Sequence, residues 1–451
     1  MSEKATVIGA GMAGCEAAWV LANNGFAVTL YEMKPKKFSP AHHSPDFAEL
    51  VCSNSLKASR VDSAAGLLKE EMTRLGSLLV PCARQCAVEA GGALAVDRDA
   101  FSSLVTSRVQ AHPNITVVHE ELDRIPAGEV IIATGPLTSD ALHEPIAALT
   151  GQSLYFYDAA APIVTRESVD MNYAFLASRY GKGGDDYLNC PMEKDEYLAF
   201  YHALIHAETA PLHDFEKDSM RVYEGCMPVE VLAKRGEDAI RYGMLKPVGL
   251  TDPRSGKRPY AVLQLRRENR EGTLWNLVGF QTNLRFGEQK RVFSMIPALH
   301  NAEFVRYGVM HRNSFLNSPK LLNAGFALRE QPRIRFAGQM TGVEGYMESA
   351  GSGLLAAWNL VRSIRGQSPL VLPPETMLGA LVGYITDPLQ ENLQPMGANM
   401  GLLPMLTERY REKQKKYQAY ADRALAALDA ALSAADMTEE TERLAQISAD
   451  F

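Results

Sequence analysis

The chain has 451 residues, enough for two or three domains with their own hydrophobic cores. Its formal net charge of −7 argues against a protein whose whole surface binds nucleic acid. No apolar run approaches the ~20 residues of a membrane-spanning helix, and the first residues lack the charged-then-apolar pattern of a signal peptide. We therefore expect a cytoplasmic protein with no membrane segment.

Six cysteines are scattered through the sequence without a Cys-x-x-Cys pair: Cys15, Cys52, Cys82, Cys86, Cys190 and Cys226. This spacing predicts neither a zinc site nor a disulfide framework, so we expect no metal. A single cysteine is most often a small buried hydrophobic residue. Spacing alone therefore leaves open whether any of the six is catalytic.

A glycine-rich loop follows the first predicted strand, 5–8, and precedes a helix. The expected dinucleotide site comprises the residues of this loop: Gly9, Ala10, Gly11, Met12, Ala13 and Gly14. The three glycines have the Gly-x-Gly-x-x-Gly spacing. The first makes a tight turn, the second lets the backbone approach a pyrophosphate, and the third lets the helix pack against the strand. The helix N-terminus then points its free N–H groups at the phosphates.

The next elements complete a first nucleotide-binding unit. A second strand, 27–31, ends in Glu32, whose carboxylate is placed to accept a hydrogen bond from a ribose hydroxyl. Helices are expected at 64–78 and 99–111, and a short strand at 115–120. A fully apolar strand at 129–133 then ends in Thr134 and Gly135, which favours FAD over NAD as the bound dinucleotide.

The composition of the sequence changes from about residue 158 to residue 300, where we expect short strands and where glycine, proline and aromatic residues are frequent. A second strand–loop–helix begins at 333 and can hold the far end of a flavin dinucleotide. Its expected cofactor residues are Gly338, Gln339, Gly342, Gly345 and Tyr346. A helix at 347–364 follows, and the region 407–444 is expected to be helical.

These elements predict an α/β fold: a Rossmann-type FAD-binding domain, like that of glutathione reductase, with an inserted α+β domain. The expected boundaries are 1–157 for the first part of the FAD-binding domain, 158–300 for the inserted domain on the substrate side, and 301–451 for the second part with the C-terminal helices.

Basic residues are concentrated in one segment. Residues 254–335 contain fifteen lysines and arginines against five acids, a net charge of +10, so the rest of the chain carries −17. Such a segment indicates a local surface for a polyanion. It is equally typical of solvated faces whose cations pair with acids elsewhere, and charge alone favours neither interpretation.

At this point the motifs resemble a known family, the bacterial folate- and FAD-dependent tRNA (uracil-5-)-methyltransferases called TrmFO, over residues 5 to about 425. The resemblance is carried by the opening glycine loop and by seven further segments: 50–57, 133–139, 187–192, 224–228, 278–283, 304–313 and 336–346. It implies an enzyme that forms 5-methyluridine at position 54 in the tRNA T-loop. The carbon would come from 5,10-methylenetetrahydrofolate, and the electrons from NADPH or NADH through FAD.

This chemistry needs an activated cysteine, because uracil C5 becomes nucleophilic only after a thiolate adds to C6. Two cysteines lie in matching motifs. The resemblance implies that Cys226 is the C6 nucleophile and that Cys52 lies at the flavin and assists, for example in proton handling. It also implies that reduced flavin carries the methylene group and that a hydride completes the methyl.

The remaining substrate candidates follow from the resemblance as well. His311 and Tyr346 are aromatic residues that can stack on a pterin, and Arg312 can meet a folate carboxylate; a purely structural role for His311 has equal weight. The nicotinamide cofactor has no second glycine loop, so we expect it to visit the folate pocket transiently. The basic segment becomes part of a tRNA surface, with the target base flipped into the site.

Three alternatives compete with this hypothesis. A flavoprotein that modifies the tRNA wobble uridine would share the opening loop, but the 224–228 motif argues against it. A plain flavin oxidoreductase would need neither the basic segment nor a nucleophilic cysteine far from the flavin loop. A non-enzymatic tRNA-binding flavoprotein can be distinguished only by assaying the product.

Overall fold

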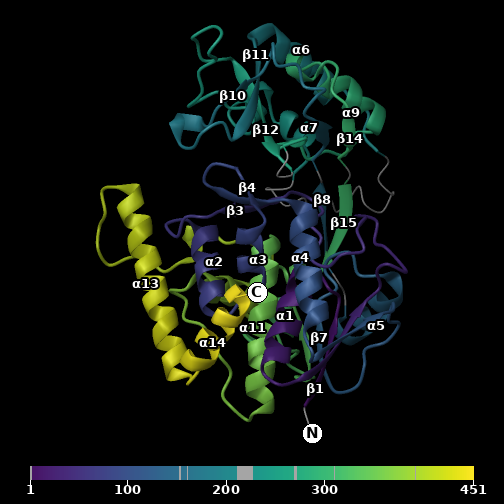
Figure 1. Ribbon diagram of the computed structural model, residues 1–451, viewed down its shortest axis with the longest axis vertical. Helices are drawn as coiled ribbons and strands as arrows, with labels where there is room; N and C mark the ends of the chain where they lie inside the picture. The colour runs from purple at the N-terminus through teal and green to yellow at the C-terminus, as the bar shows by residue number, and fades with distance from the viewer. Residues whose placement is uncertain are drawn as a thin grey trace.

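The computed structural model describes residues 3–151, 154–159, 161–210, 227–268, 272–308, 310–391 and 393–450, with the backbone alone for 154–159 and 310–314. Figure 1 shows two units, one above the other. We call residues 3–151 and 316–450 the parallel-sheet unit, and residues 161–308 the inserted unit. The antiparallel ribbon of β8 (Leu154–Ala159) and β15 (Met310–Phe315) joins them.

The parallel-sheet unit is built on a five-stranded sheet in the order β16-β7-β1-β2-β6. All neighbouring strands run parallel. Their bounds are β1 Lys4–Ile8, β2 Ala27–Glu32, β6 Ile115–His119, β7 Glu129–Ile132 and β16 Ile334–Phe336. The inner strands are apolar and buried, as expected for a parallel sheet covered on both faces. The predicted α/β fold class is confirmed.

Helices cover this sheet and place two loops at the same edge. They are α1 Met12–Asn23, α2 Ala64–Arg74, α3 Leu79–Gln85, α4 Arg98–Ala111, α5 Asp140–Thr150, α10 Ser318–Leu321, α11 Tyr346–Ile364 and α12 Met377–Thr386. Helices α1 and α11 lie side by side in the core (Figure 1). A Cβ on Gly353 would lie only 2.1 Å from the Ala13 carbonyl oxygen, far less than van der Waals contact, so the two helices touch through their backbones.

Two predicted helical regions differ from the structure. The helix expected over 64–78 ends at Arg74, because the chain turns at Gly76 (φ +84°), and α3 begins only after the expected range. Three hydrogen bonds to the buried Glu16 carboxylate, from the Ser77 hydroxyl and the N–H groups of Leu78 and Leu79, start the second helix.

The C-terminal region also differs from the expected continuous helix over 407–444. Helix α13 (Lys413–Ala434) ends before Asp436 (φ +54°), and α14 (Thr438–Asp450) folds back. Aspartate tolerates the left-handed region better than most residues, which is why the break occurs there. Residue 407 and the next five residues precede the first of these helices.

The inserted unit contains a six-stranded antiparallel sheet in the order β10-β11-β12-β13-β9-β14. The strands are β9 Ile163–Thr165, β10 Phe175–Leu176, β11 Tyr187–Met192, β12 Ala261–Arg267, β13 Leu274–Leu277 and β14 Phe304–Arg306. Helices α6 Lys194–Ile205, α7 Val229–Ala233, α8 Glu237–Arg241 and α9 Phe286–Phe293 pack with it around a separate core. Since β14 belongs to this sheet, the sheet extends past residue 300; the expected domain boundaries stay a prediction.

A small antiparallel sheet lies where the two units meet. Its strands are β3 Ser55–Ala58, β4 Ala87–Val88 and β5 Ala93–Val96, in the order β3-β5-β4. Figure 1 shows β3 and β4 on the side of the parallel-sheet unit that faces the inserted unit. The Tyr187 hydroxyl donates to the Ala90 carbonyl at 3.2 Å, and Arg267 pairs with Glu89. These contacts connect β11 and β12 to this sheet.

Short 3-10 turns complete the described structure: η1 Arg179–Gly181, η4 Pro297–Leu299, η5 Gln339–Thr341 and η6 Met400–Leu402. Among the helices of the described ranges, none is both long and apolar enough to cross a membrane.

The contact between α1 and α11 gives a first prediction. We expect Gly353→Ala to lower the free energy of unfolding by about 1–3 kcal/mol, because its methyl group has no space against Ala13. The measurement is thermal or urea denaturation. Gly383→Ala is the matched control: it changes a glycine in α12 whose Cβ would meet open space, so it should stabilise by about 0.5–1 kcal/mol. Equal effects of the two changes would contradict the packing argument.

Candidate functional site

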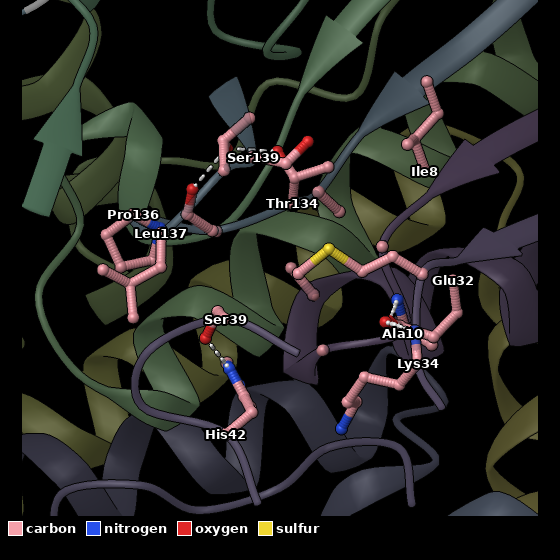
Figure 2. Close-up of a pocket in the computed structure, with 18 of the residues that line it drawn as sticks. Ile8, Ala10, Glu32, Lys34, Ser39, His42, Thr134, Pro136, Leu137 and Ser139 are labelled. Atoms are coloured by element: carbon pink, nitrogen blue, oxygen red, sulfur yellow. Dashed lines mark hydrogen bonds between the residues drawn. The ribbon is translucent and has the colours of Figure 1, made fainter. Parts of the chain in front are cut away.

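An elongated cavity of about 1290 Å³, counting the open solvent at its mouth, lies at the carboxyl ends of β1, β2, β7 and β16. This is the edge at which open parallel sheets bind their ligands. Figure 2 shows Glu32, Ala10 and Lys34 on one side of it and Thr134, Pro136, Leu137 and Ser139 across from them. The cavity also reaches Val51 and Tyr346.

The opening glycine loop forms one wall, and its glycines differ in what surrounds them. Gly9 (φ +96°) makes the turn, and a Cβ there would lie 2.7 Å from the Ala133 carbonyl oxygen. A Cβ on Gly14 would overlap the Gly9 carbonyl oxygen, so this glycine allows α1 to approach β1. A Cβ on Gly11 meets nothing within 4 Å. Gly11 therefore leaves space that a ligand can use.

Glu32 ends β2 at the cavity wall and is nearly buried. Its carboxylate accepts hydrogen bonds from the backbone N–H groups of Ala10 at 2.8 Å and Lys34 at 3.0 Å (Figure 2). These bonds fix the side chain against the glycine loop. The two oxygens keep further acceptor positions, which suit a pair of ribose hydroxyl donors.

The second strand–loop–helix lies opposite and brings the end of β16 to the same cavity. Gly338 (φ +85°) donates its N–H to the Ser352 hydroxyl at 2.7 Å, and Gln339 donates to Glu344 at 2.9 Å. Of the residues expected from the sequence, these line the cavity: Gly9, Ala10, Gly11, Met12, Ala13, Glu32, Gly135, Gly338, Gln339 and Tyr346. The other three, Gly14, Gly342 and Gly345, lie behind the lining, where Gly342 (φ +94°) and Gly345 (φ +121°) shape the loop.

Several lining residues were not expected from the sequence, among them Lys34, Ser39 and His42. Lys34 is 4% exposed; it donates to the Asp46 carbonyl and lies 3.4 Å from the Glu49 carboxylate. The Ser39 hydroxyl and His42 Nδ1 are 2.5 Å apart, and burial together with Lys34 lowers the pKa of His42. The sequence signal that could have indicated Lys34 is its position two residues after Glu32. All three lie in the segment between β2 and β3.

Cys52 lies near the same cavity and differs from the other described cysteines. Its backbone N–H donates to the Tyr346 hydroxyl at 2.7 Å, and its side chain is half-buried. Burial raises the pKa of Cys15 well above its ordinary value, and raises the pKa values of Cys82 and Cys190 to about 12. These three thiols therefore stay protonated and inert.

Cys226 lies outside the described residues, but the structure describes the chain from Met227 onward. Helix α7 begins at Val229, whose N–H donates to the Gln281 carbonyl at 2.7 Å. The buried Glu230 carboxylate accepts from the Thr282 hydroxyl and the Asn283 N–H, both at 2.8 Å. The end of the 224–228 motif is thus held next to the 278–283 motif.

His311 and Arg312 lie in β15, where the backbone pairs them with Asp158 and Tyr157 of β8. The same strand runs toward the second glycine loop: the Leu316 N–H, just after β15, donates to the Met340 carbonyl at 2.7 Å. The backbone therefore leads from these two residues directly to the loop that lines the cavity.

The basic segment is not spread over one surface. Among the described arginines of the segment, five form ion pairs with acids: Arg254 with Asp252, Arg267 with Glu89, Arg285 with Glu208, Arg291 with Glu288 and Arg335 with Glu129. Arg266 and Arg335 are buried. Pairing with acids therefore holds for part of the segment, and the polyanion surface stays a prediction. Exposed cations remain at Lys257, Arg258, Lys290 and Lys320. Within the described ranges, no three His, Cys, Asp or Glu side chains gather into a group that could hold a metal ion.

Comparison with known proteins identifies the family. A family model described as glucose inhibited division protein A matches residues 4–368. Proteins named methylenetetrahydrofolate–tRNA-(uracil-5-)-methyltransferase TrmFO are similar over most of the chain: 59% identical in Desulforamulus reducens (94% of this chain, 96% of the relative) and 57% in Geobacter sulfurreducens (95% and 99%). The chain belongs to the TrmFO family.

Membership of the TrmFO family agrees with the fold. A solved structure of Aquifex aeolicus GidA superposes with a TM-score of 0.69 at 15% identity, covering 99% of this chain and 75% of that one. That likeness is one of fold alone. The family resemblance stated from the interior motifs is confirmed.

The surroundings of Gly11 predict a variant that separates binding from folding. Gly11→Ala places a methyl group in open space with an ordinary backbone angle (φ −76°), so the melting temperature of the cofactor-free protein should stay within about 1 °C. The methyl group would occupy the place where a pyrophosphate approaches the loop, so flavin content after purification should fall severalfold. Absorbance near 450 nm per mole of protein measures it. If the flavin content does not fall, the loop is not part of the flavin-binding site.

Proposed function

We propose that this chain methylates uracil C5 in tRNA, with 5,10-methylenetetrahydrofolate as the carbon donor and FAD as the bound cofactor. The observation that carries the proposal is the 56–59% identity to proteins of that name over more than nine-tenths of the chain. The two cysteine motifs, 50–57 and 224–228, and the cavity lined by the two glycine loops also support it.

The cavity has the properties that FAD requires. Gly11 leaves open space beside the N-terminus of α1, which suits the pyrophosphate, and Glu32 suits the adenosine ribose. Gly338, Gln339 and Tyr346 line the other part and would hold the flavin side. FAD, when bound, supplies the electrons and carries the one-carbon unit between folate and the base.

The protein's own residues would prepare the uracil. The Cys226 thiolate adds to C6, which pushes electron density to C5 and makes C5 the nucleophile. After C5 has bonded to the carbon unit, its proton must leave, and Cys52 is the candidate group for that transfer. Loss of the C5 proton and elimination of the Cys226 thiolate restore the aromatic base.

The partners follow from this chemistry. The tRNA substrate would present the T-loop uridine at position 54, flipped out of its stack, and exposed lysines and arginines would contact the phosphates. His311 and Arg312 remain candidates for folate, and NADPH or NADH would visit the same pocket to reduce the flavin. We place the reaction in the cytoplasm.

The product decides between this proposal and the alternatives. Purified, FAD-loaded protein incubated with unmodified tRNA, methylenetetrahydrofolate and NADPH should yield 5-methyluridine at position 54, measured by mass spectrometry of nuclease digests. Omitting the folate should abolish the product. A modified wobble uridine would point instead to the related flavoproteins, and an unmodified tRNA that still binds would point to a non-enzymatic role.

Covalent trapping tests the nucleophile. tRNA that contains 5-fluorouridine should form a complex stable to denaturing electrophoresis, because fluorine cannot leave C5 as a proton does and the C6–sulfur bond persists. Cys226→Ser should lose this complex almost entirely. The matched control is Cys190→Ser, which changes a buried, inert thiol and should trap normally. Full trapping by Cys226→Ser would show that another residue attacks C6.

A further inference from the structure

The segment Leu50–Asn54, which carries Cys52, is held by both units at once. The Tyr346 hydroxyl accepts from the Cys52 N–H at 2.7 Å and lies 3.4 Å from the Ser53 nitrogen. Asn54 is fully buried, and its amide donates to the Val96 carbonyl at 3.0 Å and the Arg267 carbonyl at 2.8 Å. Val96 ends β5 in the parallel-sheet unit, whereas Arg267 ends β12 in the inserted unit. The position of Cys52 therefore depends on how the units meet.

Three arginines from three elements converge on this short segment. Arg98, at the start of α4, donates to the Leu50 carbonyl, and Arg306, at the end of β14, donates to the Val51 carbonyl. Arg266 of β12 donates to the Ser53 hydroxyl at 2.7 Å and to the Asn54 side-chain oxygen at 3.0 Å. Each residue around Cys52 is thus bonded to a guanidinium group or to Tyr346.

Among the residues that the structure describes, the charges around the segment Leu50–Asn54 do not balance. The described titratable and charged groups that face the segment are Arg98, Arg266, Arg306, Glu268 and Tyr346. Glu268 pairs with Arg98, and desolvation raises the pKa of the Tyr346 phenol, which stays protonated. Three guanidinium groups therefore face one carboxylate.

Electrostatic coupling between the thiol and two of these cations is direct. Burial, followed by repulsion from Arg306, lowers the pKa of Arg98 to about 10, while a negative Cys52 opposes that shift. Burial likewise lowers the pKa of Arg266, and a negative Cys52 again acts in the opposite direction. Because attraction is mutual, the same cations favour the thiolate form of Cys52.

We propose that Arg266 is a positioning residue for Cys52: from the inserted unit, its guanidinium fixes Ser53 and Asn54 and, with Arg98 and Arg306, holds the Cys52 thiol as a thiolate at neutral pH. This inference rests on the proposed function for the use of that thiolate as a proton acceptor. The proposal also makes the inserted unit part of the flavin-side site, because Arg266 of the inserted unit influences the charge of Cys52 in the parallel-sheet unit.

The test measures the thiol itself. The rate at which iodoacetamide alkylates Cys52, followed by peptide mass spectrometry from about pH 5 to 10, reports its thiolate fraction. FAD-loaded and FAD-stripped protein are compared, so that coverage by the cofactor does not hide the thiol. Arg266→Gln should move the midpoint up by about one pH unit, so alkylation at pH values well below the midpoint falls roughly tenfold. Arg266→Lys should give an intermediate midpoint, because lysine keeps the positive charge but lacks the planar set of N–H donors of a guanidinium group.

The matched control is Arg267→Gln, which removes the same charge one residue along β12, where the side chain pairs with Glu89 at the surface. It should leave the midpoint unchanged. An unchanged midpoint in Arg266→Gln, or an equal shift in Arg267→Gln, would overturn the proposal. If Arg266→Gln does not fold, Arg266→Lys and Arg306→Gln provide the same readout. Alkylation does not require methyl transfer, so a failure of the proposed function would be seen separately.

Discussion

The close backbone contact between helices α1 and α11 is the constraint on which the rest of the structure depends. Gly14 lets α1 approach β1, and Gly353 lets α11 approach Ala13. A side chain at Gly14 would push α1 away from β1, and one at Gly353 would push the two helices apart. Because the helices pack so closely, the loops before them face one cavity, although more than 300 residues separate them in the sequence. The cavity is a consequence of this helix packing.

A second constraint acts where the two units meet. The segment Leu50–Asn54 has almost no regular structure of its own, and its backbone and side-chain groups are bonded to Tyr346, Val96 and arginines from both units. The position of such a segment can be precise and still depend on the inserted unit. The chemistry proposed for the chain needs this arrangement, since a base bound by the inserted unit must meet a cofactor bound by the other.

The sequence predicted the sheet strands and the glycine loops well, because apolar strands and glycine spacing are local signals. It failed where a single residue breaks a helix: Gly76 and Asp436 adopt left-handed backbone angles that hydrophobic periodicity does not reveal. It also could not separate paired from exposed cations in the 254–335 segment. The partners Glu89, Glu129 and Glu208 lie far away in the sequence, and only the fold brings them close.

By itself the sequence determined the family, the dinucleotide loop with Glu32, and the two cysteines worth testing, because each of these is written in short contiguous motifs. Only the tertiary structure decided which thiols are inert, that Lys34 and His42 line the cavity, and that three arginines surround Cys52. Burial and electrostatics depend on which residues meet in space, and those contacts join segments more than two hundred residues apart. That is why the charge state proposed for Cys52 is argued from the fold and not from its motif.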